Sequence, residues 1–137
     1  MADGAPRTFK VAMSERCYRF KPDALPSHAP DRPGVYEFVT FDPAGTPIVL
    51  FVGYALSGSV GEALGKHLTG QAEPTAAHLF ACAKDIYFDF VARADIQDVD
   101  DLKDIAGALI ARHQPRFNVG EPPSSGKYAS VSVEEVV

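Results

Sequence analysis

Residues 33–53 read PGVYEFVTFDPAGTPIVLFVG, and this stretch decides the fold. Two runs, residues 34–41 and 47–53, are rich in Val, Ile, Phe, Tyr and Thr, which favour β-strands because branched and aromatic side chains pack well on a pleated surface. The intervening Asp42-Pro43-Ala44-Gly45 is typical of a tight turn, since proline presets φ at its second position and glycine tolerates the left-handed one. The stretch therefore predicts a β-hairpin.

The second strand of this hairpin is apolar at consecutive positions. The run Ile48-Val49-Leu50-Phe51-Val52 has no polar face, which is typical of a strand that is covered on both sides. We therefore expect this strand in the centre of the sheet, with all four side chains from Val49 to Val52 buried.

The residues after the hairpin predict three helices and one more strand. Ser57 or Ser59 can cap a helix that ends near Leu68, before Gly70. Three further elements are predicted: a short helix from Pro74 to about Lys84, a strand over 86–91, and a helix with acids at its start, from Asp98 to near His113. The expected fold is α+β, with a small central, mostly antiparallel three-stranded sheet flanked by helices.

The two ends of the chain differ in composition from this central part. Four prolines within residues 1–32 exclude a long helix there and predict a proline-rich N-terminal extension that packs on the domain, with short extended segments over 8–13 and 17–20. Residues 33–118 form the predicted domain. Residues 119–137 are interpreted as a linker and C-terminal tail, although Ser and Val alternate after Tyr128.

Length, charge and cysteine count restrict the class of protein. A chain of 137 residues with 46% hydrophobic composition suits one globular domain. It has no apolar run of about 18 residues and no N-terminal signal pattern, so we expect a cytoplasmic protein without a membrane partner. Its two cysteines suit reduced thiols rather than a disulfide framework. The net charge of −5 predicts weak or no autonomous binding to nucleic acid.

Several short motifs occur together along residues 30–118. Pro33-Gly34-Val35-Tyr36 is followed fifteen residues after the tyrosine by Phe51-Val52-Gly53. His67 lies near the end of the next predicted helix, and the pair Leu109-Ile110 precedes Gln114-Pro115-Arg116-Phe117-Asn118. In these features the chain resembles the GIY-YIG nuclease superfamily.

The resemblance implies a phosphodiesterase site that uses one divalent metal ion, such as Mg²⁺. In that family the sheet carries two tyrosines, the next helix an arginine, a later helix a metal-binding glutamate, and an asparagine closes the site. Such chemistry needs oxygen ligands for the metal and a cation that balances the charge on the phosphate. Each of these family residues has a matching position in this chain.

Three family positions keep their residue. Tyr36 matches the first tyrosine, His67 a position often held by histidine, and Asn118 the closing asparagine. Each also has a structural interpretation: a buried strand tyrosine, a helical histidine that packs or caps, and an asparagine that forms a turn.

Three positions depart from the family pattern. Phe51 replaces the second tyrosine, Ala63 the arginine and Ala106 the metal-binding glutamate. Without a metal ligand and a phosphate cation, hydrolysis is not expected. The resemblance therefore predicts a catalytically degenerate domain with no metal site and no cofactor.

The leading hypothesis is a nuclease-inactive domain that acts as a binding or interaction module for a protein partner, within an assembly that processes nucleic acid. The alternative is a metal-dependent GIY-YIG endonuclease with a non-standard active site that uses Mg²⁺. A third hypothesis is nucleic-acid binding without cleavage, through Lys66, Arg112 and Arg116. The helices that carry these cations have no basic stripe, which weighs against the third hypothesis.

Overall fold

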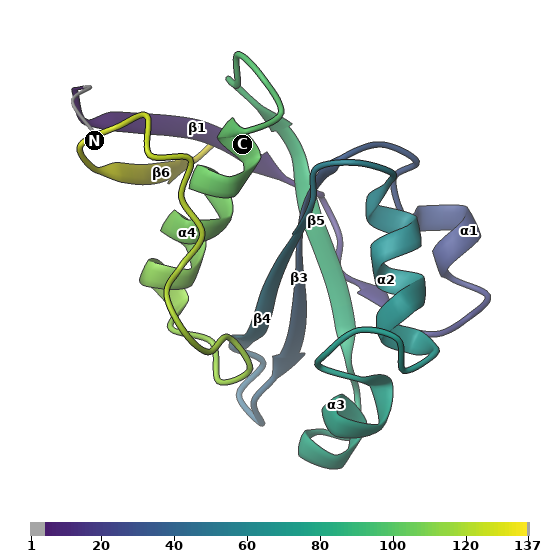
Figure 1. Cartoon of the computed structure of the whole chain (residues 1–137). Coiled ribbons are helices and arrows are strands. Elements are labelled where there is room, and N and C mark those ends of the chain that lie inside the picture. Colours follow the sequence, from purple (N-terminus) through teal and green to yellow (C-terminus); the bar gives the residue numbers. More distant parts are fainter. Residues whose placement is uncertain (1–4, 137) are drawn as a thin grey trace.

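The computed structural model describes residues 5–136 and contains helices and strands in one α+β arrangement (Figure 1). The strands are β1 (Arg7–Met13), β2 (Tyr18–Arg19), β3 (Gly34–Phe41), β4 (Pro47–Ala55), β5 (Tyr87–Ala94) and β6 (Val131–Glu135). The helices are α1 (Leu25–His28), α2 (Val60–Leu68), α3 (Ala76–Cys82) and α4 (Asp101–His113). Among the described residues no helix is both long and apolar enough to cross a membrane.

The sheet is larger than predicted and is mixed rather than purely antiparallel. Its order is β4-β3-β5-β1-β6, with β2 also paired to β5. The predicted three-stranded antiparallel unit is present as β4-β3-β5, but β1 extends it through antiparallel pairing with β5, and β6 adds a parallel pair with β1. The expected α+β class is therefore confirmed, whereas the three-stranded sheet is wrong, because segments outside residues 33–118 complete the sheet.

The hairpin formed by β3 and β4 is confirmed. Asp42 stabilises its turn, since one carboxylate oxygen accepts hydrogen bonds from the backbone N–H groups of Ala44 and Thr46, both at 2.9 Å. Gly45 has φ of +84°, the left-handed conformation that the turn requires.

The position of β4 corrects the sequence prediction. β4 lies at the edge of the sheet and β3 occupies the centre of the β4-β3-β5 unit. Leu50 and Val52 are buried as expected, but Val49 and Phe51 are only half-buried. An apolar run does not distinguish a central strand from an edge strand whose edge another segment covers.

That cover comes from the segment after α4. The backbone N–H of Phe117 donates to the carbonyl oxygen of Leu50 at 3.1 Å. The Asn118 side chain accepts from the Val52 N–H at 2.8 Å and donates to the Val52 carbonyl oxygen at 2.9 Å. These bonds satisfy backbone groups that an edge strand would otherwise expose.

A β-bulge in the hairpin also changes which side chains share a face. The register steps from the pair Phe38 with Phe51 to the pair Val39 with Val49, which leaves Leu50 unpaired. Leu50 and Phe51 therefore both pack on the same hydrophobic cluster, while Val52 belongs to the other one. Without the bulge, the alternation of side chains along β4 would place Leu50 and Val52 on the same face.

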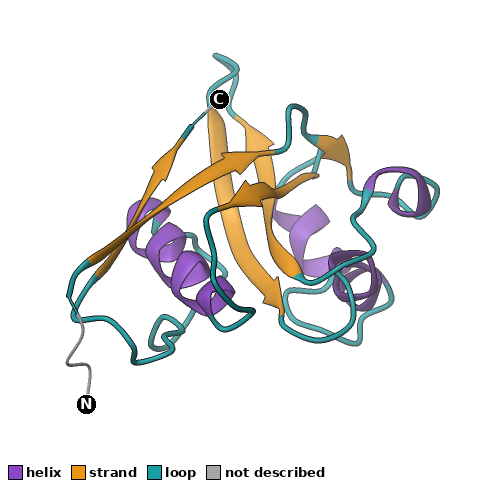
Figure 2. Ribbon diagram, turned by 90° about the horizontal axis from the view of Figure 1, so that it is seen from above, coloured by secondary structure: helices purple, strands orange, loops and turns teal. Residues whose placement is uncertain are grey.

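Helices cover the two faces of the sheet (Figure 2). On one face α4 packs over a core that includes Phe9, Val52 and Ile105. On the other, α2 and α3 pack over a core that includes Phe38 and Leu64. The two faces thus have separate cores, and the edge of β4 lies between the helices of the two faces (Figure 1).

The helix boundaries follow local capping. The Ser59 hydroxyl accepts from the Glu62 N–H at 3.0 Å at the start of α2, and the Thr75 hydroxyl accepts from the His78 N–H at 3.2 Å at the start of α3. α4 begins at Asp101 rather than at the predicted Asp98.

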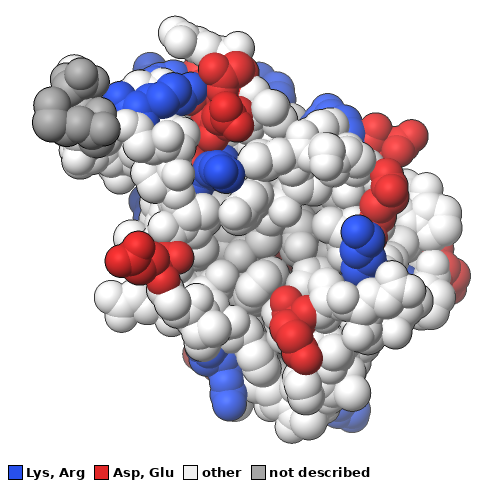
Figure 3. Space-filling view, viewed as in Figure 1, with Lys and Arg blue, Asp and Glu red and all other residues white. Residues whose placement is uncertain are grey.

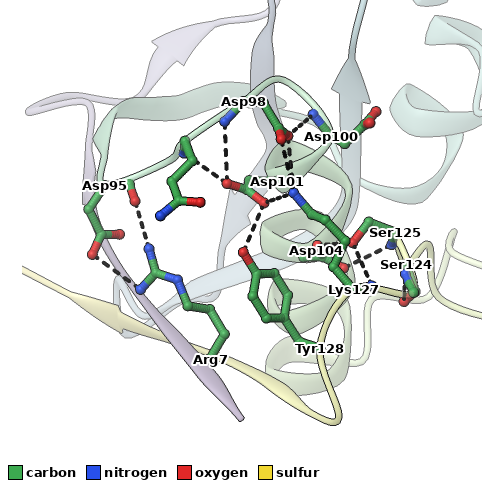
Figure 4. Close-up of polar contacts among 12 residues, drawn as sticks. Arg7, Asp95, Asp98, Asp100, Asp101, Asp104, Ser124, Ser125, Lys127 and Tyr128 are labelled. Atoms are coloured by element: carbon green, nitrogen blue, oxygen red, sulfur yellow. Dashed lines mark hydrogen bonds and ion pairs between the residues drawn. The ribbon is translucent and has the colours of Figure 1, made fainter. Parts of the chain in front are cut away.

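The segment interpreted as linker and tail lies along α4, and we call residues 119–128 the strap. Asp104 accepts from the Ser125 N–H at 2.9 Å, and Asp101 contacts the Lys127 ammonium at 2.7 Å (Figure 4). Gly107 of α4 faces the strap, so close to the Pro123 carbonyl oxygen that a Cβ would clash with it. Beyond the strap, β6 pairs with β1, so the described C-terminal residues are packed on the rest of the fold.

Candidate functional site

Tyr36 lies in the central strand β3 and is only 4% exposed. It is paired in register with Gly53 of β4, and its ring covers that glycine. A Cβ on residue 53 would come within 2.5 Å of the Tyr36 hydroxyl oxygen. Gly53 is therefore required for the close approach of this ring, as glycine often is opposite an aromatic residue in a sheet.

Tyr36, His67 and Pro74 form a buried hydrogen-bonded chain. The Tyr36 hydroxyl lies 2.7 Å from His67 Nε2, and His67 Nδ1 lies 2.9 Å from the Pro74 carbonyl oxygen. Because that carbonyl can only accept, Nδ1 carries the ring proton, and Nε2 of a neutral ring then accepts from Tyr36. Burial lowers the pKa of His67 and raises the pKa of Tyr36, so both side chains are held neutral.

The residues that match the family site lie together. Tyr36, Phe51, His67 and Asn118 line one hollow of about 290 Å³ at the edge of β4. A second hollow of about 330 Å³ adjoins it and shares Tyr36 and His67. We call these two hollows the β4-edge cleft.

The cleft is bounded by four parts of the fold. Its walls come from α2 and the loop that follows it on one side, and from α4 and the strap on the other. Figure 3 shows a hollow between these two sides whose floor carries no charged side chains. Tyr54, which is 37% exposed, lines both hollows and offers an accessible aromatic ring.

The three positions that depart from the family pattern offer no metal ligand. Ala106 is 0% exposed and belongs to the core between α4 and the sheet. Ala63 lines the cleft next to Lys66, and Phe51 contributes only its ring. Within residues 5–136 no three His, Cys, Asp or Glu side chains are grouped to hold a metal ion. The three positions thus supply no oxygen ligand for the Mg²⁺ ion that the resemblance implies.

The three cations of the nucleic-acid hypothesis are not brought together in the cleft. Lys66 lines it, but Arg112 pairs with Glu135 at 3.1 Å and Arg116 donates to the sulfur of Cys82 at 3.2 Å. The charged residues that line the cleft are three glutamates and one lysine, namely Glu62, Glu73, Glu121 and Lys66. The cleft is therefore acidic.

Sequence reasoning missed a buried carboxyl pair on the other face of the sheet. Glu37 and Asp89 are paired in register on β3 and β5, and Glu37 is 3% exposed. Burial, with Asp89 beside it, raises the pKa of Glu37 to about 10, and burial also raises the pKa of Asp89, so Glu37 is protonated at neutral pH. His113 Nε2 lies 3.7 Å from a Glu37 oxygen. The sequence signal that could have indicated this pair is an acid in the middle of each of two apolar runs, VYEFV at 35–39 and YFDFV at 87–91.

Comparisons of this chain with protein-family models, with curated proteins and with solved structures found no match. The resemblance to GIY-YIG nucleases thus depends on the motif residues around Tyr36, Phe51 and Asn118 alone. It stays a prediction.

Proposed function

We propose that this chain is a nuclease-inactive GIY-YIG-like domain that acts as a binding module for a protein partner within an assembly that processes nucleic acid. The observation that supports it most is the buried hydrogen bond between the Tyr36 hydroxyl and His67 Nε2, at 2.7 Å. Because the Tyr36 hydroxyl donates its one proton to His67, it has no proton left to donate to an attacking water or to a phosphate oxygen. Ala106, buried in the core, offers no carboxylate for a metal.

The β4-edge cleft is the recognition surface in this proposal. Tyr54 and Phe51 supply aromatic contact area, which is enriched at protein interfaces. Glu73 and Glu121 on opposite walls give the cleft a negative potential. The segment that fits is therefore a basic peptide that places an apolar or aromatic side chain on the cleft floor.

Selection from a random peptide library tests this recognition. We expect enriched peptides to carry Lys or Arg beside an apolar anchor, and to lose affinity for the Glu73→Lys/Glu121→Lys variant. Glu134→Lys is the matched control, because Glu134 is exposed on β6 and away from the cleft. Enrichment of acidic peptides, or equal binding to all three proteins, would contradict the proposal.

The absence of nuclease activity is tested separately. We expect no nicking of supercoiled plasmid with Mg²⁺ or Mn²⁺, because the positions of the metal ligand and the phosphate cation hold Ala106 and Ala63. Nicking that depends on metal and disappears in Tyr36→Phe would instead support the alternative, an endonuclease with a non-standard active site.

A further inference from the structure

A hollow of about 590 Å³ lies on another part of the molecule, between β1, β5 and the start of β3. Its position follows from the strand register. Ala12 of β1 is opposite Arg93 of β5, and Lys10 precedes Ala12 by two residues, so all three side chains project from one face of the sheet. The intervening Val11 points into the core under α4.

Three cations line this hollow: Lys10, Arg32 and Arg93. Arg32 is fixed over β5 because its guanidinium donates to the Ala92 carbonyl oxygen at 2.9 Å. Neither the Lys10 ammonium nor the Arg93 guanidinium forms an ion pair with any residue in the described range 5–136. Glu134 of β6 is the register partner of Lys10, but it forms no ion pair with it among the described residues. In a chain of net charge −5, a group of three cations without a direct ion pair is unusual.

The one acid that lines the hollow is already paired. Asp95 contacts the Arg7 guanidinium at 3.4 Å, and its other carboxylate oxygen accepts from the Lys10 backbone N–H at 2.8 Å. Arg7 also donates to the Asp95 carbonyl oxygen at 2.7 Å. The charge of Asp95 is thus largely neutralised from outside the hollow, and the three cations retain a positive potential inside it.

The walls of the hollow are partly apolar. Ile96 and Val136 line it and are 37% and 39% exposed. Val91 and Leu102 are also among its lining residues, but their side chains are buried in the core under α4. A volume of this size lies within the range of sites for small organic ligands, which combine apolar walls with a few placed polar groups. The hollow therefore matches a ligand with both an anionic and an apolar part.

We propose that this hollow binds a small amphipathic anion, in which a carboxylate or phosphate contacts Lys10, Arg32 and Arg93 and an apolar group lies against Ile96 and Val136. The site is separate from the β4-edge cleft and has the opposite charge. Three cations around one concave site are too few to hold a tract of nucleic acid at physiological salt. Glu15 and Glu135 line the adjoining hollow beyond Arg93, which limits the positive surface to this one place.

Titration of the ¹⁵N-labelled chain with octanoate and with octanol, followed by amide chemical shifts, tests the proposal. The two probes share an apolar chain and differ in charge. We expect octanoate to give saturable shifts at Gly34, Ala92 and Ala94, and octanol to bind about five-fold more weakly or less, because one charge contact near the surface contributes about that factor. Inorganic phosphate, which lacks the apolar part, should also bind more weakly than octanoate.

Substitution of the cations tests whether they are responsible for octanoate binding. Arg93→Gln and Lys10→Gln should each weaken octanoate binding about five-fold, whereas Arg16→Gln, the same change at an exposed arginine outside the hollow, should not. Equal affinity for octanoate and octanol would overturn the proposal. So would shifts that map to the β4-edge cleft, unchanged binding by Arg93→Gln, or sub-micromolar binding of duplex DNA lost in the same variant.

Discussion

Two glycines, one crowded and one in open space, test the packing of Tyr36 at the cleft. Gly53 lies under the Tyr36 ring, where a Cβ would clash, whereas Gly65 in α2 has no atom within 4 Å of the position a Cβ would take. We expect Gly53→Ala to destabilise the fold by about 1 to 3 kcal/mol through overpacking and loss of the Tyr36 to His67 bond. Gly65→Ala should stabilise it by up to about 1 kcal/mol. Urea unfolding measures both, and a neutral Gly53→Ala would refute the packing of Tyr36 described here.

Single residues also show what the sequence could not predict. Tyr36 and His67 are separated by 31 positions, and only the packing of α2 on β3 brings their side chains to 2.7 Å. No local pattern contains that distance. Asn118 was identified by its place after Pro115, but its two hydrogen bonds to Val52 follow from the edge position of β4.

At the scale of elements, the strap should contribute to stability through α4. Asp104 is 2% exposed and accepts from the Ser125 N–H, so Asp104→Ala leaves that half-buried donor unpaired. We expect a loss of about 1 to 3 kcal/mol in the free energy of unfolding. Ser125→Ala should add little in the Asp104→Ala background, because the two residues share one interaction.

The acid just before the start of the same helix provides the control. Asp100 lies next to the start of α4, and its side chain makes no capping hydrogen bond. Asp100→Ala should therefore change the free energy of unfolding by less than about 0.5 kcal/mol. If thermal melts showed Asp104→Ala to be equally harmless, the strap would not be held on α4 in solution.

The elements themselves were predictable where their causes are local. The β3-β4 hairpin follows from its turn, and α2 follows from Ser59 as its cap. The helix expected from Pro74 begins instead at Ala76, where the Thr75 hydroxyl caps it. The position of each strand in the sheet is not determined by local sequence. β4 was expected at the centre because its apolar run is continuous, but Phe117 and Asn118, far along the chain, cover its edge instead.

At the scale of the whole molecule, Glu37 should make stability depend on pH. Its pKa is raised to about 10, by burial first and then by Asp89, from an ordinary value of 4.5. The stability that depends on its proton is therefore complete below about pH 4.5 and is lost as the pH rises toward 10. Glu37→Gln carries no charge at any pH and avoids the cost of ionising a buried carboxyl group. We therefore expect the free energy of unfolding of this variant to exceed that of the wild type at pH 8 by about 1 to 3 kcal/mol.

Other groups around Glu37 set the rest of the pH profile. It is faced by Asp89 on β5, Glu135 on β6, Arg112 and His113 on α4, and, through Asp89, Cys17 before β2. Burial lowers the pKa of His113 and of His67, so their contributions to stability are complete above about pH 6.5 and are lost as the pH falls below that value. Urea unfolding of both proteins from pH 5 to 9 separates the two effects. Parallel profiles would show that Glu37 is not the titrating group.

The pairing of β6 with β1 also governs the order in which this fold can form. The Thr8 and Ser132 hydroxyl groups meet at 2.8 Å across 124 positions of sequence, whereas the β3-β4 hairpin closes over a few residues. Closing a longer loop costs more chain entropy before any contact compensates for it, and folds rich in distant pairings form slowly. The hairpin is therefore suited to act as an early nucleus, and we expect the β1-β6 ladder to be the part of the sheet that assembles last.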